Sequence, residues 1–329
     1  MTKNSAGETI RRYFIVGGAG FIGSHAVDYL LSSTSVSRVT IFDNFSSGQR
    51  WHLRDHLSDQ RLKIVEGDAK DKNVLRREMN ERDVIIHLAS NPDIARAAVD
   101  PEIDFREGTA LTQNVLEAMR ITGAKRLLYA SGSGIYGDLG DFEIPEDFGP
   151  LLPISTYGAS KLAGEALISA YCHMFDLSAC VFRFANVVGP RQTHGICYDF
   201  VRKLLSNPNE LSILGDGTQS KSYVHVRDAL QAVFIAANQS EKHYEVYNVA
   251  TRDYVTVKEI ADLTVNSLGL STNNVQYKFT TGRSGWKGDI PVVRFNTERI
   301  RKLGWIPRMS SREAISDALS SLISDSKQS

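Results

Sequence analysis

Two hydrophobic periods alternate along the first half of the chain. Short runs rich in β-branched residues predict strands at Tyr13–Val16, Val39–Phe42, Lys63–Val65, Val84–His87, Arg126–Ala130 and Ala179–Arg183. Between them, amphipathic stretches predict helices at Ser24–Leu31, Leu75–Asn80, Thr112–Thr122 and Tyr157–Met174. Strands that alternate with helices form right-handed βαβ units, so the pattern predicts an α/β fold with a doubly wound parallel sheet.

The alternation breaks at about Gly189. Gly189-Pro190, a polar stretch at Ser206–Glu210 and the turn Gly215-Asp216-Gly217 interrupt shorter elements. We therefore expect a flexible tail over residues 1–12, a first domain over 13–188 and a smaller mixed α/β lobe over 189–329. Some segments of that lobe are expected to return to the first domain.

Composition excludes several function classes. The 38 basic and 38 acidic residues cancel, so no overall field recruits nucleic acid or an anionic membrane surface. No apolar run reaches the ~18 residues that a membrane span needs. The three cysteines cannot all pair and have no CxxC spacing, which favours a reducing, cytoplasmic setting. The histidines show no metal-ligand spacing, so we expect no metal.

A glycine-rich turn follows the first predicted strand. Gly17, Gly20 and Gly23 have the GxxGxxG spacing, with a strand before them and a helix after them. Such a turn lets a pyrophosphate approach the backbone N–H groups at a helix N-terminus, whereas a tight turn with no ligand is the plainer alternative. The context favours dinucleotide binding and a Rossmann-type sheet.

Two acidic residues follow the next two strands. Asp43 ends the second strand, twenty residues after Gly23, where a carboxylate accepts both hydroxyls of an adenosine ribose and repels a 2′-phosphate. This predicts NAD rather than NADP. Asp68 follows the third strand, where the adenine edge would lie; its alternative role is a helix cap.

A proton-transfer pair lies on the fourth predicted helix. Tyr157 and Lys161 are four residues apart and so share one helix face. A nearby ammonium favours the phenolate and lowers a tyrosine pKa from about 10 towards neutral pH. A surface pair without function is the alternative, but the glycine turn favours catalysis.

These motifs resemble the extended short-chain dehydrogenase/reductases, specifically the NAD-dependent nucleotide-sugar epimerase/dehydratase group. The resemblance runs from Phe14 to about Pro307. It is carried by VGGAGFIGSH, DN, GDAKD, IIHLAS, NVLEAMR, SGIYGD, YGASK, RFANVVGPRQ, LGDGTQSKSYVHVRDA, YNVA and LGWIP.

The resemblance implies a Rossmann domain, a sugar-nucleotide lobe and an active site between them. It also implies a homodimer built from helices such as Thr112–Thr122 and Tyr157–Met174. Tyr157 would take a sugar hydroxyl proton, and Lys161 would hold the nicotinamide ribose. The implied NAD contacts are Gly17, Gly20, Phe21, Ile22, Gly23, Asp43, Asn44, Asp68, Ala69, Leu88, Ala89, Ser90, Tyr157 and Lys161.

The chain departs from the family at two relay positions. The family places Ser or Thr four residues before the tyrosine of its xVYG segment, where this chain has Gly132 before Tyr136. Ser131 and Ser133 flank Gly132, so either could supply the hydroxyl. A family asparagine on the preceding helix falls at Gly108.

The same segment separates reaction classes. Family 4,6-dehydratases follow their threonine with an Asp-Glu pair, where this chain has Ser133-Gly134. The acidic residue of the decarboxylating branch and the cysteine of the fucose-synthase branch are missing too. Epimerisation, which needs only tyrosine, lysine and NAD, remains.

The resemblance also indicates substrate contacts. Asn186 matches a residue that approaches the diphosphate. Two family arginines fall at Lys221 and Trp286, and Arg283 or Lys287 could supply the missing charge. Val293 stands where the family controls bulk at the sugar C2 substituent, which leaves room for an N-acetyl group.

We therefore expect an NAD-dependent nucleotide-sugar epimerase, acting at C4 of a UDP-sugar through a transient 4-keto intermediate. The alternatives are a nucleotide-sugar oxidoreductase or atypical dehydratase, and a catalytically impaired NAD-binding protein. Gly132 and Gly108 support the impaired protein, whereas the retained Tyr157 and Lys161 argue against it.

Overall fold

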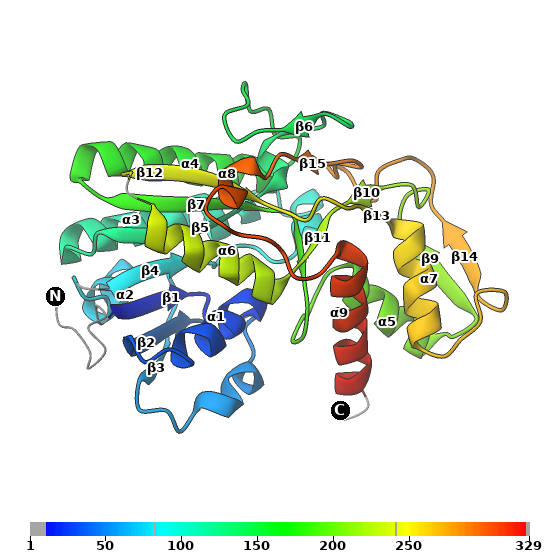
Figure 1. The fold of residues 1–329 in the computed structure, drawn as a ribbon, viewed down its shortest axis with the longest axis horizontal. Coiled ribbons are helices and arrows are strands. Elements are labelled where there is room, and N and C mark those ends of the chain that lie inside the picture. Colours follow the sequence, from blue (N-terminus) through cyan, green and yellow to red (C-terminus); the bar gives the residue numbers. More distant parts are fainter. Residues whose placement is uncertain (1–10, 82, 241, 327–329) are drawn as a thin grey trace. The chain divides into compact units, whose positions relative to one another are not determined.

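A computed structural model describes residues 11–81, 83–240 and 242–326 (Figure 1). The predicted tail over 1–12 lies outside the described residues up to residue 10, and the first strand begins at Arg11. Chain contacts divide the protein into two compact units. The first comprises the chain to Ser131, Ser160–Phe182 and Val233–Val246; the second comprises Gly132–Ala159, Arg183–Ala232 and the chain from Tyr247 on.

The main sheet has seven strands in the order β12-β7-β5-β4-β1-β2-β3. The five strands from β3 to β5 pair in parallel, with Val16 opposite both Phe42 and His87. This confirms the predicted doubly wound α/β fold. The strands are β1 Arg11–Val16, β2 Val36–Asp43, β3 Leu62–Glu66, β4 Asp83–His87, β5 Arg126–Gly132, β7 Ser178–Phe184 and β12 Tyr244–Val249.

Helices pack on both faces of this sheet because adjacent residues of a strand point to opposite sides. Phe14 and Val16 share a buried cluster with side chains of α2, α3 and α4. Tyr13 instead meets Phe234 of α6 edge to face, and Phe234 stacks on Tyr29 of α1. The helices are α1 Phe21–Leu31, α2 Lys72–Glu78, α3 Ala110–Thr122, α4 Thr156–Phe175 and α6 Val226–Gln239.

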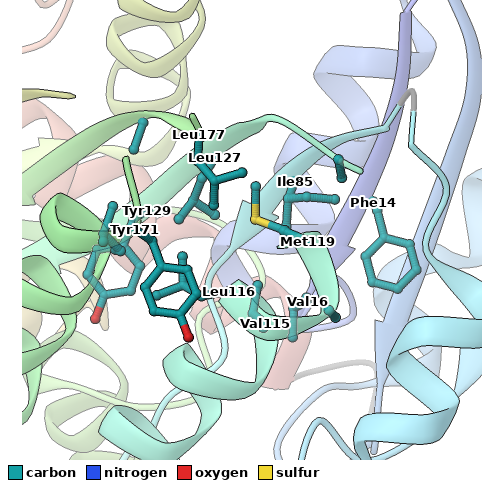
Figure 2. Close-up of a cluster of buried hydrophobic side chains, with 14 of the residues drawn as sticks. Phe14, Val16, Ile85, Val115, Leu116, Met119, Leu127, Tyr129, Tyr171 and Leu177 are labelled. Atoms are coloured by element: carbon teal, nitrogen blue, oxygen red, sulfur yellow. The ribbon is translucent and has the colours of Figure 1, made fainter. Parts of the chain in front are cut away.

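Figure 2 shows the core on the α2–α3–α4 face. Val115, Leu116 and Met119 of α3 lie among Val16 and Ile85 of the sheet. Tyr171 of α4 belongs to the same cluster and reaches α3 with its hydroxyl, which donates to Glu117 Oε1 at 2.5 Å. Apolar packing and this polar contact together fix α4 against α3.

The second unit combines short strand pairs with helices. Its strands are β6 Glu143–Ile144, β8 Asn186–Val188, β9 Glu210–Ile213, β10 Ser220–Lys221, β11 Tyr223–His225, β13 Val255–Thr256, β14 Gln276–Phe279 and β15 Arg294–Phe295. They pair as β6·β15, β8·β11, β9·β14 and β10·β13. A second hydrophobic cluster joins α5 Ile196–Ser206, α7 Val257–Ser267 and α9 Ser311–Ser326. This unit also contains α8 Glu298–Arg301 and the short η4 Ser133–Ile135, whereas η1 Arg50–His56, η2 Ile94–Ala98 and η3 Phe105–Thr109 belong to the first unit.

A buried polar network stabilises the segment after β5. Tyr136 donates to Asn248 Oδ1 at 2.7 Å and accepts from Arg183 Nη1 at 2.8 Å. Asn248 in turn donates its backbone N–H to Glu146 Oε1 at 2.9 Å. Burial raises the pKa of Tyr136 to about 12, so this phenol stays neutral and structural.

Within the described ranges, none of the helices has the length and apolar character to cross a bilayer. The described residues also include no group of three or more His, Cys, Asp or Glu side chains placed to hold a metal.

Candidate active site

The turn between β1 and α1 brings backbone N–H groups to the carboxyl end of the sheet. Gly17 has φ 85°, in the left-handed region that favours glycine, and its N–H donates to Phe42 O at 2.9 Å. A Cβ on Gly23 would lie 2.4 Å from Gly17 O, so α1 packs this closely only because residue 23 is glycine. The N-cap residue Gly20 has no side chain to cap the helix, which leaves its first N–H groups for an anion.

This turn lies where the strand order reverses, since β1 separates β2 from β4. In open α/β sheets a ligand binds at that point, outside the carboxyl ends of the strands. Leu88 and Ala89 follow β4 and donate their N–H groups to Val16 O at 2.9 and 3.0 Å. The predicted cofactor residues at 17–23 and 88–90 therefore lie side by side.

Asp43 is fixed over the turn. It is buried at the end of β2; its Oδ2 accepts from Ala19 N at 2.9 Å and its Oδ1 accepts from Phe45 N at 2.8 Å. Burial raises the pKa of Asp43, and the two backbone hydrogen bonds oppose that rise. The carboxylate is thus held at the strand end where the sequence predicts a ribose contact.

Asp68 does not cap a helix, so the capping alternative is wrong. Asp71 caps α2 by accepting from Asn73 N and Val74 N. Asp68 lies close to Asn44, whose Nδ2 donates to Asp68 Oδ2 at 3.4 Å. Ala69, the next residue, is buried and accepts from Asn114 Nδ2 at 3.0 Å through its carbonyl oxygen.

Tyr157 and Lys161 both lie on α4, one turn apart. Lys161 is only 4% exposed, and its Nζ donates to Ala130 O at the end of β5 at 2.8 Å. Burial lowers the pKa of Lys161 to about 8, with the charges of Glu165 and Asp104 opposing the fall. Tyr157 is partly exposed, and its ring lies near the backbone of Gly134.

Comparison with known proteins gives the same assignment over most of the chain. Residues 13–250 match the model of the NAD dependent epimerase/dehydratase family. The chain belongs to this family. The UDP-glucose 4-epimerase of Mycolicibacterium smegmatis is 30% identical over 312 residues, 92% of this chain and 96% of that protein.

Two solved structures share the fold. A crystal structure of a UDP-galactose 4-epimerase is 35% identical, with a TM-score of 0.84, and the match covers 95% of this chain and 99% of that one. The dTDP-glucose 4,6-dehydratase of Streptomyces venezuelae, solved with NAD bound, is 26% identical, with a TM-score of 0.88 and coverage of 96% and 98%.

The residues present fit NAD, the family's cofactor. Gly20 has ordinary backbone angles, φ −72° and ψ 178°, and a Cβ there would lie 3.4 Å from Gly17 O. The fold alone therefore tolerates a side chain at residue 20, and glycine there leaves room for a pyrophosphate beside the helix N-terminus. Asp43 is held at the end of β2, where the sequence predicts the ribose acceptor.

The two serines at the relay position differ in their surroundings. Ser131 is buried and donates to Glu165 Oε1 at 2.5 Å. Ser133 begins the short helix η4 and is partly exposed; within the described part of the chain its hydroxyl makes no hydrogen bond. Gly132, between them, is extended, and a Cβ there would meet only Phe184 O, at 4.0 Å.

Gly108 lies in the π-helical turn η3 against α4. A Cβ at this position would come within 2.2 Å of Ser160 Oγ, which donates to Asp104 O at 2.7 Å. Ser160 therefore fills the space that an asparagine side chain would need. The departure from the family at Gly108 is built into the packing of this segment.

The predicted substrate residues all belong to the second unit. Lys221, on β10, is paired with Asp289 at 2.6 Å. Arg283 is exposed and Trp286 partly buried, in the segment before Asp289, while Val293 is buried. Asn186 begins β8, and its N–H donates to Ser222 O at 3.3 Å.

Sequence reasoning missed two buried carboxylates around the lysine. Glu165 follows Lys161 by four residues, so the helical spacing that paired Tyr157 with Lys161 could have found it. Asp104 gives no such signal, because it lies far away in the sequence and only the packing of η3 brings it near.

Proposed function

We propose that this family member is an NAD-dependent nucleotide-sugar epimerase that acts at C4 of a UDP-sugar through a transient 4-keto intermediate. The observation that carries the proposal is the buried Lys161 one turn after Tyr157 on α4, in a chain whose β5–η4 segment has no Asp-Glu pair. Relatives named UDP-glucose and UDP-galactose 4-epimerase support it.

In this proposal Tyr157 accepts the proton of the sugar C4 hydroxyl and returns it after the sugar turns. NAD, when bound, supplies the hydride acceptor and donor. Lys161 is hydrogen-bonded to Ala130 O, so its ammonium is held in place and favours the phenolate by its charge. The chain thus contributes orientation and electrostatics to the reaction.

A net dehydration has less support. Water elimination needs an acid and a base besides the tyrosine, and the segment that carries them in dehydratases has Ser133 and Gly134 here. A Cβ on Gly134 would meet Gly158 Cα at 3.4 Å, so this position lies directly against the start of α4.

We further propose a division of roles along the chain. Residues 13–188 form the NAD-binding domain, and residues 189–329 mainly bind the sugar nucleotide, through Lys221, Arg283, Trp286 and Val293. Asn186, just before this second range, is the fifth proposed substrate contact. Because Asp289 pairs with Lys221, we assign the net positive charge for a diphosphate to Arg283 and Lys287, both exposed.

We infer a cytoplasmic homodimer. Exposed apolar side chains lie along the α3–α4 side of the first unit: Phe105 is 63%, Ile121 47% and Met174 71% exposed. A second copy that covers these side chains would remove their apolar surface from water, which is the support for a dimer at these helices. The three cysteines are free and buried, as expected for a reducing compartment.

Ser133 is our candidate for the relay hydroxyl, since Ser131 is bound to Glu165. Ser133→Ala should lower kcat about 10²-fold, in the range expected for one proton-transfer group. Adding Gly132→Ser should restore part of that loss, because its extended backbone and surroundings accept a side chain. Steady-state kinetics on the three proteins test this, and an unchanged kcat in Ser133→Ala would contradict the assignment.

The proposed function is tested by turnover without added NAD. The purified protein is incubated with UDP-glucose, UDP-N-acetylglucosamine or UDP-glucuronate, and products are identified by chromatography and NMR. We expect an epimer of one sugar and no accumulating NADH. Net NADH would instead indicate an oxidoreductase, and loss of water an atypical dehydratase. Silence on all three, with NAD detected in the protein by mass spectrometry, would favour an impaired NAD-binding protein.

A further inference from the structure

A buried carboxylate lies beside the catalytic lysine and has no role in the function proposed above. Glu165 is 3% exposed and follows Lys161 by one turn of α4. A carboxylate rarely lies so deep unless it is hydrogen-bonded and paired with a charge. Its neighbours therefore indicate why it is there.

Two consecutive residues at the end of β5 bind the two successive turns of α4. Ala130 accepts from Lys161 Nζ at 2.8 Å through its carbonyl oxygen, and Ser131 donates its hydroxyl to Glu165 Oε1 at 2.5 Å. The strand end thus holds the ammonium and the carboxylate by adjacent contacts. Lys161 and Glu165 are therefore positioned by neighbouring residues of one strand.

We propose that Glu165 is a positioning residue that keeps the Lys161 ammonium charged and in place, with Ser131 holding the carboxylate. The inference rests on the proposed role of Lys161, but it concerns a property that is measurable without substrate. It assigns Ser131 to this support and leaves proton relay to Ser133.

The charges around Lys161 support the direction of the effect. Burial lowers the pKa of Lys161 to about 8, and Glu165 is the larger of the two opposing charges, followed by Asp104. His87 of β4 adds no charge above acid pH, since burial, followed by the Lys161 charge, lowers its pKa to about 3. The ring of Tyr129 lies 5.2 Å from Nζ, and Tyr157 is one turn earlier on the helix.

The sign of the pH effect follows from these directions. Below a pKa of about 8 Lys161 is charged, and above it the charge is lost. Removing the negative charge of Glu165 lowers this pKa further, so the lysine becomes neutral at a lower pH. Any activity that needs the Lys161 ammonium is then lost at a lower alkaline pH in the variant than in the wild type.

The test uses Glu165→Gln, which keeps an acceptor oxygen for Ser131 and removes only the charge. Lysine labelled with ¹³C and ¹⁵N is titrated by NMR in the full-length protein, with Lys161→Met assigning the signal. We expect the pKa of Lys161 to fall by about 1, the low end for an opposite charge at short range. Where turnover is measurable, the alkaline limb of kcat should move down in parallel.

Two further variants keep the test decisive. Asp104→Asn removes the other buried carboxylate, and we expect it to lower the pKa of Lys161 by less than Glu165→Gln does. Ser131→Ala keeps the charge of Glu165 but removes the hydrogen bond that holds its carboxylate. It should lower the pKa of Lys161 as Glu165→Gln does, and so it provides a test even if Glu165→Gln fails to fold. Thermal unfolding monitors the fold of each protein.

An unchanged pKa of Lys161 in Glu165→Gln and in Ser131→Ala overturns the inference, whatever the enzyme's activity. Conversely, a shifted pKa together with silence on every sugar nucleotide would leave the positioning role in place and overturn the proposed function. The two failures are therefore distinguishable.

Discussion

Replacing Tyr157 with phenylalanine should lower epimerase turnover by about 10³-fold or more and leave the bound NAD in place. The phenol oxygen is the only atom removed, and in our proposal it is the proton acceptor for the sugar hydroxyl. One positioned acid–base group contributes about 10²–10⁴ in rate, and epimerisation uses this oxygen twice. The substitution keeps the partly exposed ring in its place near Gly134, so the start of α4 should fold normally.

The measurement is kcat on the sugar found to react, together with the NAD content of the purified protein by mass spectrometry. Tyr29→Phe is a matched control, since Tyr29 lies on α1 with its ring stacked on Phe234. We expect wild-type turnover from it. Wild-type turnover in Tyr157→Phe would remove the tyrosine from the mechanism, and loss of NAD from that variant would make it a cofactor contact instead.

The sheet could be predicted from the sequence because its strands are short and most of them are largely buried, β3 at the edge being the exception. The six predicted strands all occur in the main sheet, each extended by one or a few residues at its ends. The seventh, β12, follows α6 and was not specified, although segments were expected to return. Strand-length apolar runs identify a core strand but contain no information about its neighbour.

Helix ends were harder to place. The amphipathic pattern predicts a helix from Ser24, whereas α1 begins at Phe21. The N-cap residue is Gly20, which has no capping side chain by which the sequence could mark this start. The helix predicted at Leu75–Asn80 begins at Lys72, where Asp71 caps it. The sequence thus contains two aspartates, Asp68 and Asp71, that could cap this helix, and the structure shows that Asp71 does so.

The candidate site shows the same division between local and distant information. Tyr157, Lys161 and Glu165 follow one helical spacing, and the sequence contains all of it. The bond from Ser131 to Glu165 spans 34 residues, and that from Lys221 to Asp289 spans 68. Such pairs depend on how a helix or loop packs on a strand, which no periodicity within one segment determines.

Gly108 illustrates a limit of comparison by motif. Aligned with the family, it looks like the loss of a catalytic side chain. In the structure its Cβ position is filled by Ser160 Oγ, more than 50 residues later in the chain. Gly108 and Ser160 therefore pack against each other as a pair, and the glycine alone does not indicate lost activity.

Substitutions in the phosphate turn should show which glycine the fold requires and which one NAD binding requires. A Cβ on Gly23 would lie 2.4 Å from Gly17 O and 2.7 Å from Gly18 Cα, so Gly23→Ala forces the backbone to move. Alanine within a helix normally stabilises by up to about 1 kcal/mol relative to glycine. Here we expect a net loss of about 1–3 kcal/mol, the cost of overpacking, together with loss of NAD binding.

Gly20→Ala should behave differently. Its Cβ would lie 3.4 Å from Gly17 O, and its backbone angles suit any residue. The free energy of unfolding of the NAD-free variant should therefore differ from that of the wild type by no more than about 1 kcal/mol, the scale of an N-cap change. The added methyl group would occupy space beside the N–H groups that a pyrophosphate approaches, so NAD affinity should fall at least tenfold. Thermal unfolding of the NAD-free proteins and calorimetric titration with NAD measure the two effects. Equal losses of stability in both variants would mean that the fold, and not the cofactor, requires glycine at position 20.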